Sequence, residues 1–165
     1  MIPNKNGRKI NINFEYHTHE DKPGLEYYSL AIPTENPEVT AGRLNFKFTK
    51  ENGKKCVWLI DVQVSSEFAG KGYGGALLDV LDYVSAKNLV ASISGKFYPH
   101  DNGLSKQDLI KFYESHGYSY DEYDKEIFKY VSKNKVMETF KDRISGLEDP
   151  ISVIDTKEKD DGMEM

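Results

Sequence analysis

The chain has 165 residues, of which 38% are hydrophobic and 12% aromatic, a composition typical of a globular protein and not of a disordered one. Its formal net charge is -5, and the seven acids and two lysines of residues 146–165 account for that charge, so residues 1–145 lack the basic excess of a non-specific nucleic-acid binder. No apolar run approaches the roughly 20 residues that a membrane span needs.

The first half of the chain predicts strands. Residues 1–8 are polar and basic, so no secretory signal is expected. Alternating or continuous apolar patterns predict four strands, over residues 9–16, 27–32, 41–49 and 56–64. Pro33 ends the second strand, and the pair Asn52-Gly53 predicts a tight hairpin between the third and the fourth. Strands two to four are therefore expected to form an antiparallel meander.

The middle of the chain predicts a helix between two strands. Four apolar residues recur at helical spacing after a glycine-rich stretch and predict a helix over residues 76–86: Leu77, Val80, Leu81 and Val84. Residues 89–97 form the fifth predicted strand. Strand, helix and strand in this order predict a right-handed parallel crossover.

The remaining elements complete one predicted domain over residues 1–145. A capping box from Ser105 to Asp108, with a hydrophobic staple between Leu104 and Leu109, begins a helix that is expected to end near His116. Two short strands and a last amphipathic helix follow, over residues 118–120, 126–131 and 135–144. Residues 146–165 are expected to be an acidic, disordered tail.

The stretch from Ala69 to Gly75 holds four glycines between a strand and a helix. Free backbone N–H groups at a helix N-terminus bind a diphosphate well, and glycine lets the main chain approach it without a Cβ clash. Lys71 adds a positive charge. Two alternatives stay open, namely a dinucleotide fingerprint, Gly70-x-Gly72-x-x-Gly75, whose next strand lacks the expected acid, and a turn that only packs the helix onto the sheet.

The glycine stretch resembles the coenzyme A loop of the GNAT superfamily of N-acetyltransferases, Arg/Gln-x-x-Gly-x-Gly/Ala, which begins five residues after a strand-ending valine. Here that valine is Val64, and Ala69 stands in place of the Arg or Gln. The run Tyr113-x-x-x-Gly117-Tyr118 resembles the family's other signature, and the block around it is similar to that of small phage-type members, some of which modify bacterial defence proteins. The resemblance spans residues 41–131.

Two features depart from the family outline. Members commonly have two helices between their first two strands, whereas residues 17–25 are too few for them and contain Pro23-Gly24. This would leave the acceptor side of the site open. Lys106 stands where an Asn is common.

The resemblance implies an α+β GNAT-like acyl-CoA N-acyltransferase fold, with a mixed, mostly antiparallel sheet of about six to seven strands flanked by helices. It also implies an enzyme that moves acetyl from acetyl-CoA to a primary amine. Coenzyme A would be held by the end of the fourth strand and by the glycine stretch, that is, by Val62, Gln63, Val64, Ala69, Gly70, Lys71, Gly72, Tyr73, Gly74 and Gly75.

Tyr113 and Asp61 are the candidate catalytic residues. A phenol, with a pKa near about 10, stays protonated at neutral pH and can donate to a departing thiolate, but Tyr113 also belongs to an apolar helical stripe and would serve equally as core. Asp61 is the candidate base for the amine. It could equally be an exposed or ion-paired residue of its strand.

The sequence does not decide whether the amine acceptor is a protein lysine, a polyamine or an aminoglycoside. Asp121, Glu122, Asp124 and Glu126 lie among tyrosines and would suit a cation, although an ordinary charged turn explains them as well. The alternative function is a non-catalytic interaction module of the same fold that binds a protein partner. Neither reading expects a nucleic-acid or membrane partner, and both allow a monomer or a homodimer.

His17, His19 and Glu20 lack the three or four convergent ligands of a metal site, so no metal is expected. Cys56 is the single cysteine, which excludes an internal disulfide. It is expected to be a small buried hydrophobe and not a nucleophile. An unpaired thiol fits a reducing compartment, and a cytoplasmic location is expected.

Overall fold

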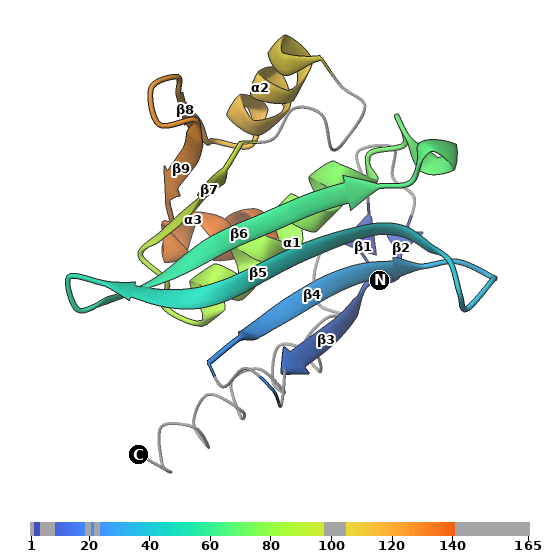
Figure 1. Ribbon diagram of the computed structural model, residues 1–165, viewed down its shortest axis with the longest axis horizontal. Coiled ribbons are helices and arrows are strands. Elements are labelled where there is room, and N and C mark those ends of the chain that lie inside the picture. Colours follow the sequence, from blue (N-terminus) through green and yellow to red (C-terminus); the bar gives the residue numbers. More distant parts are fainter. Residues whose placement is uncertain (1, 4–8, 19–20, 22–23, 98–104, 141–165) are drawn as a thin grey trace.

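The computed structural model describes residues 2–3, 9–18, 21, 24–97 and 105–140. Its main feature is a seven-stranded sheet (Figure 1). In spatial order the strands are β3 (Asn13–Thr18), β4 (Glu26–Pro33), β5 (Thr40–Glu51), β6 (Lys54–Val64), β7 (Ser92–Lys96), β9 (Glu126–Tyr130) and β8 (Ser119–Asp121). A separate two-stranded sheet pairs β1 (Ile2–Pro3) with β2 (Lys9–Ile10).

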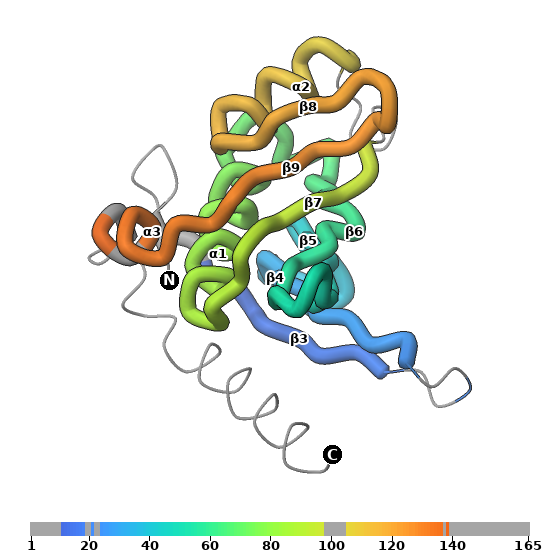
Figure 2. The backbone as a smooth tube through the Cα atoms, turned by 90° about the vertical axis from the view of Figure 1, so that its left-hand side faces the viewer, coloured from blue at the N-terminus to red at the C-terminus, as the bar shows by residue number. Residues whose placement is uncertain are grey.

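The helices lie on one face and at one end of this sheet. They are η1 (Ser66–Phe68), α1 (Tyr73–Lys87), α2 (Lys106–Ser115) and α3 (Lys133–Phe140). Figures 1 and 2 place α1 and α3 on the same side of the strands and α2 beside β8. No helix of the described residues lies over the opposite face of β3 to β6 (Figure 1). None of the helices described is long and apolar enough to cross a membrane.

The core lies between the sheet and α1. One row of directly paired residues crosses four strands, from Phe14 through Leu30 and Leu44 to Val62, and the last three of these side chains are buried. Since side chains alternate between the two faces of a strand, the neighbouring residues point to the other face. The apolar stripe predicted on α1 is confirmed, because Leu77, Val80, Leu81 and Val84 are all buried.

One strand pair gives the sheet its mixed character. β6 and β7 are parallel, whereas every other pair in the seven-stranded sheet is antiparallel. Their pairing runs from Cys56 opposite Ser92 to Leu59 opposite Gly95. The register of β6 on β5 shifts at the next residue, so Ile60 is a bulge. From there to Val64, β6 has no strand of the described residues paired on its β7 side.

The meander and its hairpin confirm the sequence prediction. Asn52 and Gly53 form the turn between β5 and β6 with φ angles of 53° and 78°, as a two-residue hairpin with both residues left-handed requires. The fold class predicted from the sequence is likewise confirmed, with a mostly antiparallel sheet flanked by helices.

Two predicted strands have different bounds in the structure. The strand predicted over residues 9–16 is divided into β2 and β3, since its continuation would have to pair with Pro33, which has no N–H to donate. The strand predicted over residues 89–97 begins only at Ser92, because Leu89 adopts a left-handed φ of 59° and ends α1. There the N–H of Val90 donates to the carbonyl of Ser85.

The end of the chain is described only as far as residue 140. The helix predicted over residues 135–144 begins two residues earlier in the structure, where α3 starts at Lys133. The acidic tail, the predicted staple residue Leu104 and the residues His19 and Glu20 lie outside the described residues.

A buried ion pair joins α1 to β9. The Lys129 Nζ lies 2.9 Å from the Asp82 Oδ2, and the two side chains are only 12% and 10% exposed. The same ammonium donates to the backbone oxygen of His116 at 2.9 Å, which ties in the end of α2. Burial raises the pKa of Asp82, and the positive charge of Lys129 opposes that rise.

We expect Lys129→Met to lower the free energy of unfolding by about 3–5 kcal/mol, because it leaves the Asp82 carboxylate buried without its partner. The double variant Asp82→Leu/Lys129→Met should recover most of this loss, since no charge is then buried. Urea unfolding at neutral pH measures both values. An equal loss of unfolding free energy in the single and the double variant would show that the unpaired Asp82 charge is not what destabilises the single variant.

Candidate functional site

The glycine stretch forms the link between β6 and α1, and its glycines serve two different needs. Gly70 and Gly72 have φ angles of 77° and 82°, a left-handed conformation that favours glycine. A Cβ on Gly74 would lie 3.2 Å from the ring of Phe112, and one on Gly75 would lie 3.0 Å from the Nε2 of His116. The last two glycines therefore let α2 pack closely on the start of α1.

The backbone amides at the start of α1 have no acceptor within the described structure. Gly72 is the N-cap and supplies no side-chain cap. The first helical bond is donated by the N–H of Ala76 to the carbonyl of Gly72, and no hydrogen bond from an N–H of Gly72, Tyr73, Gly74 or Gly75 is found among the described residues. These amides and the positive end of the helix dipole suit an anionic ligand.

A cavity of about 130 Å³ lies against this helix start. It is bounded by β6, the glycine stretch and α2, through Val62, Val64, Phe68, Ala69, Gly70, Gly72, Tyr73, Gly74, Leu109 and Phe112. Seven of the ten residues predicted to hold the cofactor are among them. The sequence reasoning missed Phe68, Leu109 and Phe112 as part of this site, although Leu109 and Phe112 belong to the same apolar helical stripe as Tyr113.

Three predicted cofactor residues do not line the cavity. Gln63 is exposed, and its amide donates to Asp61 at 3.3 Å on the other face of β6. Lys71 holds its ammonium 5.5 Å from the centre of the Phe68 ring. Gly75 packs against His116. Each of these three residues contacts a neighbouring side chain and does not line the cavity.

Tyr113 lies on the buried face of α2 and is only 7% exposed. Its ring packs against Phe97, Phe112 and Tyr118, with centroids 5.3 to 6.5 Å apart. Burial, together with the negative charge of Asp61, raises the pKa of Tyr113 to about 12. The phenol is therefore protonated at neutral pH, and Asp61 is near enough for its charge to act on it.

Asp61 follows the bulge of β6 and points to the face away from α1. Its Oδ1 accepts a hydrogen bond from the Asn45 amide at 2.7 Å, and its Oδ2 accepts one from Gln63. The carboxylate thus has two amide donors, and no ion pair to it occurs among the described residues. Asn45 is a partner that the sequence reasoning missed, because it comes from the neighbouring strand.

Three of the four acidic side chains predicted to suit a cation have local partners. Glu122 pairs with Lys106 at 2.7 Å, and Glu126 pairs with Lys96 at 3.0 Å. Asp121 accepts hydrogen bonds from the backbone amides of the turn. These contacts favour the ordinary charged turn over a site that selects a cation.

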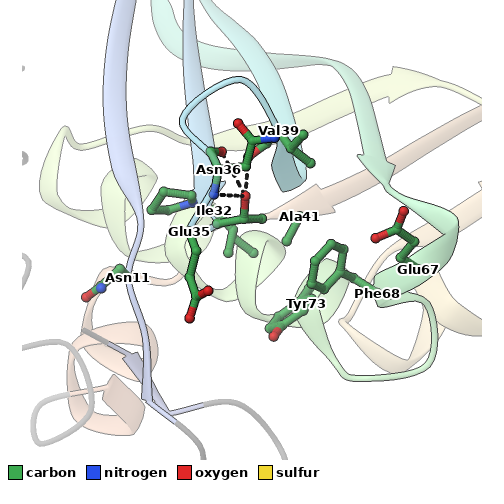
Figure 3. A pocket seen from close by; sticks show the side chains of 11 residues that line it. Asn11, Ile32, Glu35, Asn36, Val39, Ala41, Glu67, Phe68 and Tyr73 are labelled. Atoms are coloured by element: carbon green, nitrogen blue, oxygen red, sulfur yellow. Dashed lines mark hydrogen bonds between the residues drawn. The ribbon is translucent and has the colours of Figure 1, made fainter.

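A second, larger hollow of about 840 Å³ lies on the far side of Phe68 and Tyr73. These two rings form one wall, and Ile32 and Glu35 lie across from them (Figure 3). Neither Asp61 nor Tyr113 lines this hollow or the smaller cavity. The smaller cavity is the better candidate site, because Gly72 and Gly74, whose amides are unbonded, line it and do not line the larger hollow.

Other candidate chemistry is limited in the part of the chain that the structure describes. No three His, Cys, Asp or Glu side chains gather there as metal ligands would. Cys56 is 4% exposed and accepts a hydrogen bond from Ser92 at 3.4 Å. It is placed as a small buried side chain, as the sequence predicted.

Comparison with known proteins identifies the fold. Neither a protein-family model nor a curated protein matches the sequence. Among solved structures, AtaTR bound with acetyl-CoA is similar, with 14% identity over 69% of this chain and 72% of that one and a TM-score of 0.54. The KacTA–DNA complex is similar as well, with 17% identity over 72% and 76% of the two chains and a TM-score of 0.54.

These similarities show that the chain has the GNAT fold, as its motifs led us to expect. The AtaT–AtaR complex bound to DNA also matches, at 13% identity and a TM-score of 0.53. Because two of these structures contain DNA, the expectation of no nucleic-acid partner for this chain stays a prediction.

The raised pKa of Tyr113 predicts a loss of stability in alkali. The unfolded phenol ionises near pH 10, whereas the folded one ionises near pH 12. The unfolded chain therefore releases its proton first, and stability falls as the pH rises between these values. Relative to Tyr113→Phe, we expect the wild type to lose about 1 kcal/mol between pH 9 and pH 11 in urea unfolding. Parallel curves would contradict the burial of this phenol.

Proposed function

We propose that this protein is an N-acetyltransferase that moves acetyl from acetyl-CoA to a primary amine, and that it acts in the cytoplasm. The observation that carries the proposal is the set of unbonded amides at the start of α1, next to a cavity that reaches the open edge of β6. Several amides at a helix N-terminus favour a diphosphate. The GNAT fold raises the expectation that this diphosphate belongs to coenzyme A.

The residues of the chain have distinct roles in this proposal. Acetyl-CoA would supply the activated thioester. The amides from Gly72 to Gly75 hold the diphosphate, and the edge of β6 from Val62 to Val64 holds the pantetheine arm as an added strand would be held. Tyr113 keeps a proton available for the thiolate, and Asp61 accepts the proton of the amine directly or through water.

We infer that the acceptor is large, and a lysine on a protein surface is our first choice. Only residues 19–25 connect β3 to β4, and no helix of the described residues covers the face on which Asp61 lies. A bulky partner can therefore approach this face. A polyamine or an aminoglycoside would use less of the surface and stays a second choice, since Glu122 and Glu126 already pair with lysines.

A non-catalytic interaction module of the same fold is the rival function, and Ala69 in place of the usual Arg or Gln favours it. It predicts binding of coenzyme A without transfer, or no binding at all. A dinucleotide-dependent protein predicts instead that NAD binds and coenzyme A does not.

Gly70→Ala tests the diphosphate site with a close control. Gly70 and Gly53 have φ angles of 77° and 78°, and a Cβ on either would meet no atom within 4 Å. Each alanine should therefore cost a similar 1–2 kcal/mol of stability, about the strain of a left-handed residue. Only Gly70→Ala should lower the affinity for acetyl-CoA, because strain there shifts the amides that hold the diphosphate. A loss of about 1.4 kcal/mol of binding free energy corresponds to a tenfold lower affinity.

Calorimetric titration with acetyl-CoA, coenzyme A and NAD measures these affinities. Equal affinities for acetyl-CoA in the Gly70→Ala and Gly53→Ala variants would contradict the assignment of the loop. Binding of NAD alone would favour the dinucleotide reading.

Tyr113→Phe tests catalysis. We expect kcat to fall by about a hundredfold or more, because the proton donor for the thiolate is lost, while the affinity for acetyl-CoA stays the same. Release of the free thiol of coenzyme A, measured with a lysine peptide, spermidine and an aminoglycoside as acceptors, reports turnover. Tyr123→Phe is the control, since Tyr123 is 93% exposed. Unchanged turnover in Tyr113→Phe would remove Tyr113 from this role.

A further inference from the structure

A row of polar side chains crosses the sheet on the face away from α1 and ends at Asp61. In direct strand register, Glu15 on β3 lies opposite Ser29 on β4, Ser29 lies opposite Asn45 on β5, and Asn45 lies opposite Asp61 on β6. This row is adjacent to the core row that ends at Val62. Ser29, Asn45 and Asp61 are joined by hydrogen bonds, and of these three only Asp61 has one of the acetyl-transfer roles given above.

The direction of these hydrogen bonds is determined by chemistry. The Asp61 carboxylate only accepts, so Asn45 must turn its Nδ2 toward it, at 2.7 Å. The Oδ1 of Asn45 then faces Ser29, and the Ser29 hydroxyl must donate to it, at 2.5 Å. If the amide of Asn45 were reversed, an oxygen would face a carboxylate. The Asp61 carboxylate therefore sets which way the Asn45 amide points, and the hydrogen bond from Ser29 holds that amide in place against Asp61 Oδ1.

The inner end of this chain of bonds is shielded from water. Ser29 is 0% exposed although no described helix covers its face. Glu15 on β3 and Arg43 on β5 form an ion pair at 2.7 Å, and because β4 lies between these strands, the pair must pass across β4. Ala31, which lies opposite Arg43, is 2% exposed. Water therefore competes little for the hydroxyl of Ser29.

We propose that Asn45, itself held by a hydrogen bond from Ser29, is the positioning residue for the Asp61 carboxylate in the deprotonation of the acceptor amine. The proposal rests on the function proposed above. Each Asp61 oxygen retains a second lone pair after accepting its amide hydrogen bond, and one such pair takes a proton from the ammonium form of the acceptor. The neutral amine nitrogen then bonds to the acetyl carbon, the carbon–sulfur bond breaks, and the thiolate gains the proton of Tyr113. The second proton that the nitrogen loses as the amide forms restores the Tyr113 phenol, directly or through water.

A double-mutant cycle between Asn45 and Asp61 tests the proposal. Asn45→Ala should lower kcat by about tenfold, with the KM for acetyl-CoA unchanged, because an oriented donor to the base is lost. In the Asp61→Asn background the same change should alter kcat by less than about twofold, since the group that Asn45 positions is already absent. Ser29→Ala should give a smaller loss of the same kind.

Lys47→Ala is the matched control, because Lys47 lies on the same strand and face as Asn45 and is exposed. Its kcat should equal that of the wild type. Asn45→Asp supplies a second variant of nearly the same shape. It should lower kcat at least as much as Asn45→Ala, because it sets a second carboxylate against Asp61, and it keeps the test decisive if Asn45→Ala does not fold. The acetyl-CoA affinity of each variant shows whether it has folded.

The outcomes separate this inference from the proposed function. Non-additive losses in kcat support it. Additive losses, a change confined to KM, or full activity of Asn45→Ala would overturn the positioning role while leaving the acetyltransferase intact. A wild-type protein that binds acetyl-CoA and acetylates no acceptor would overturn both.

Discussion

The arrangement of the candidate site depends on how far two parallel strands stay together. β6 and β7 pair only as far as Leu59 and Gly95, and they approach each other so closely there that a Cβ on Gly95 would lie 2.6 Å from the carbonyl oxygen of Leu59. One residue later the bulge at Ile60 increases the twist of β6. Past this point β6 pairs, among the residues that the structure describes, with β5 alone, and its other edge faces the glycine stretch. The cavity, the unbonded amides and Asp61 all lie along this divergent segment.

The divergence also separates two kinds of chemistry on one strand. Because side chains alternate, Val62 and Val64 face the cavity and the core, whereas Asp61 and Gln63 face the other side. Tyr113 comes from α2, and α2 is seated on α1 by the two glycines that have no room for a side chain. A short segment of β6 can thus contribute an apolar wall to one ligand and a carboxylate to another without a loop between them.

Much of this could be predicted from the sequence because the deciding signals are local. The hairpin at Asn52-Gly53, the cap at Ser105 and the apolar stripe of α1 each depend on residues within a few positions of one another, and each is confirmed. The sequence predicts the strand at residues 89–97 to begin too early, because Leu89 has a left-handed backbone conformation that is rare in residues other than glycine and asparagine. The hydrogen bonds from Ser29 through Asn45 to Asp61 were not foreseen, because strand register joins residues that are far apart in the chain. Packing of Gly74 and Gly75 on α2 was missed for the same reason.

The ion pair between Asp82 and Lys129 has a consequence for how such a chain can diverge over time. The two residues are 47 positions apart, and each is tolerable in the interior only while the other is present. Substitutions at these two positions are therefore expected to occur together during evolution, or after stabilising substitutions elsewhere in the chain. Related chains should carry either both charges or two uncharged residues here. These two columns of an alignment should then vary together, although the chain between them includes the whole of α2, β7 and β8.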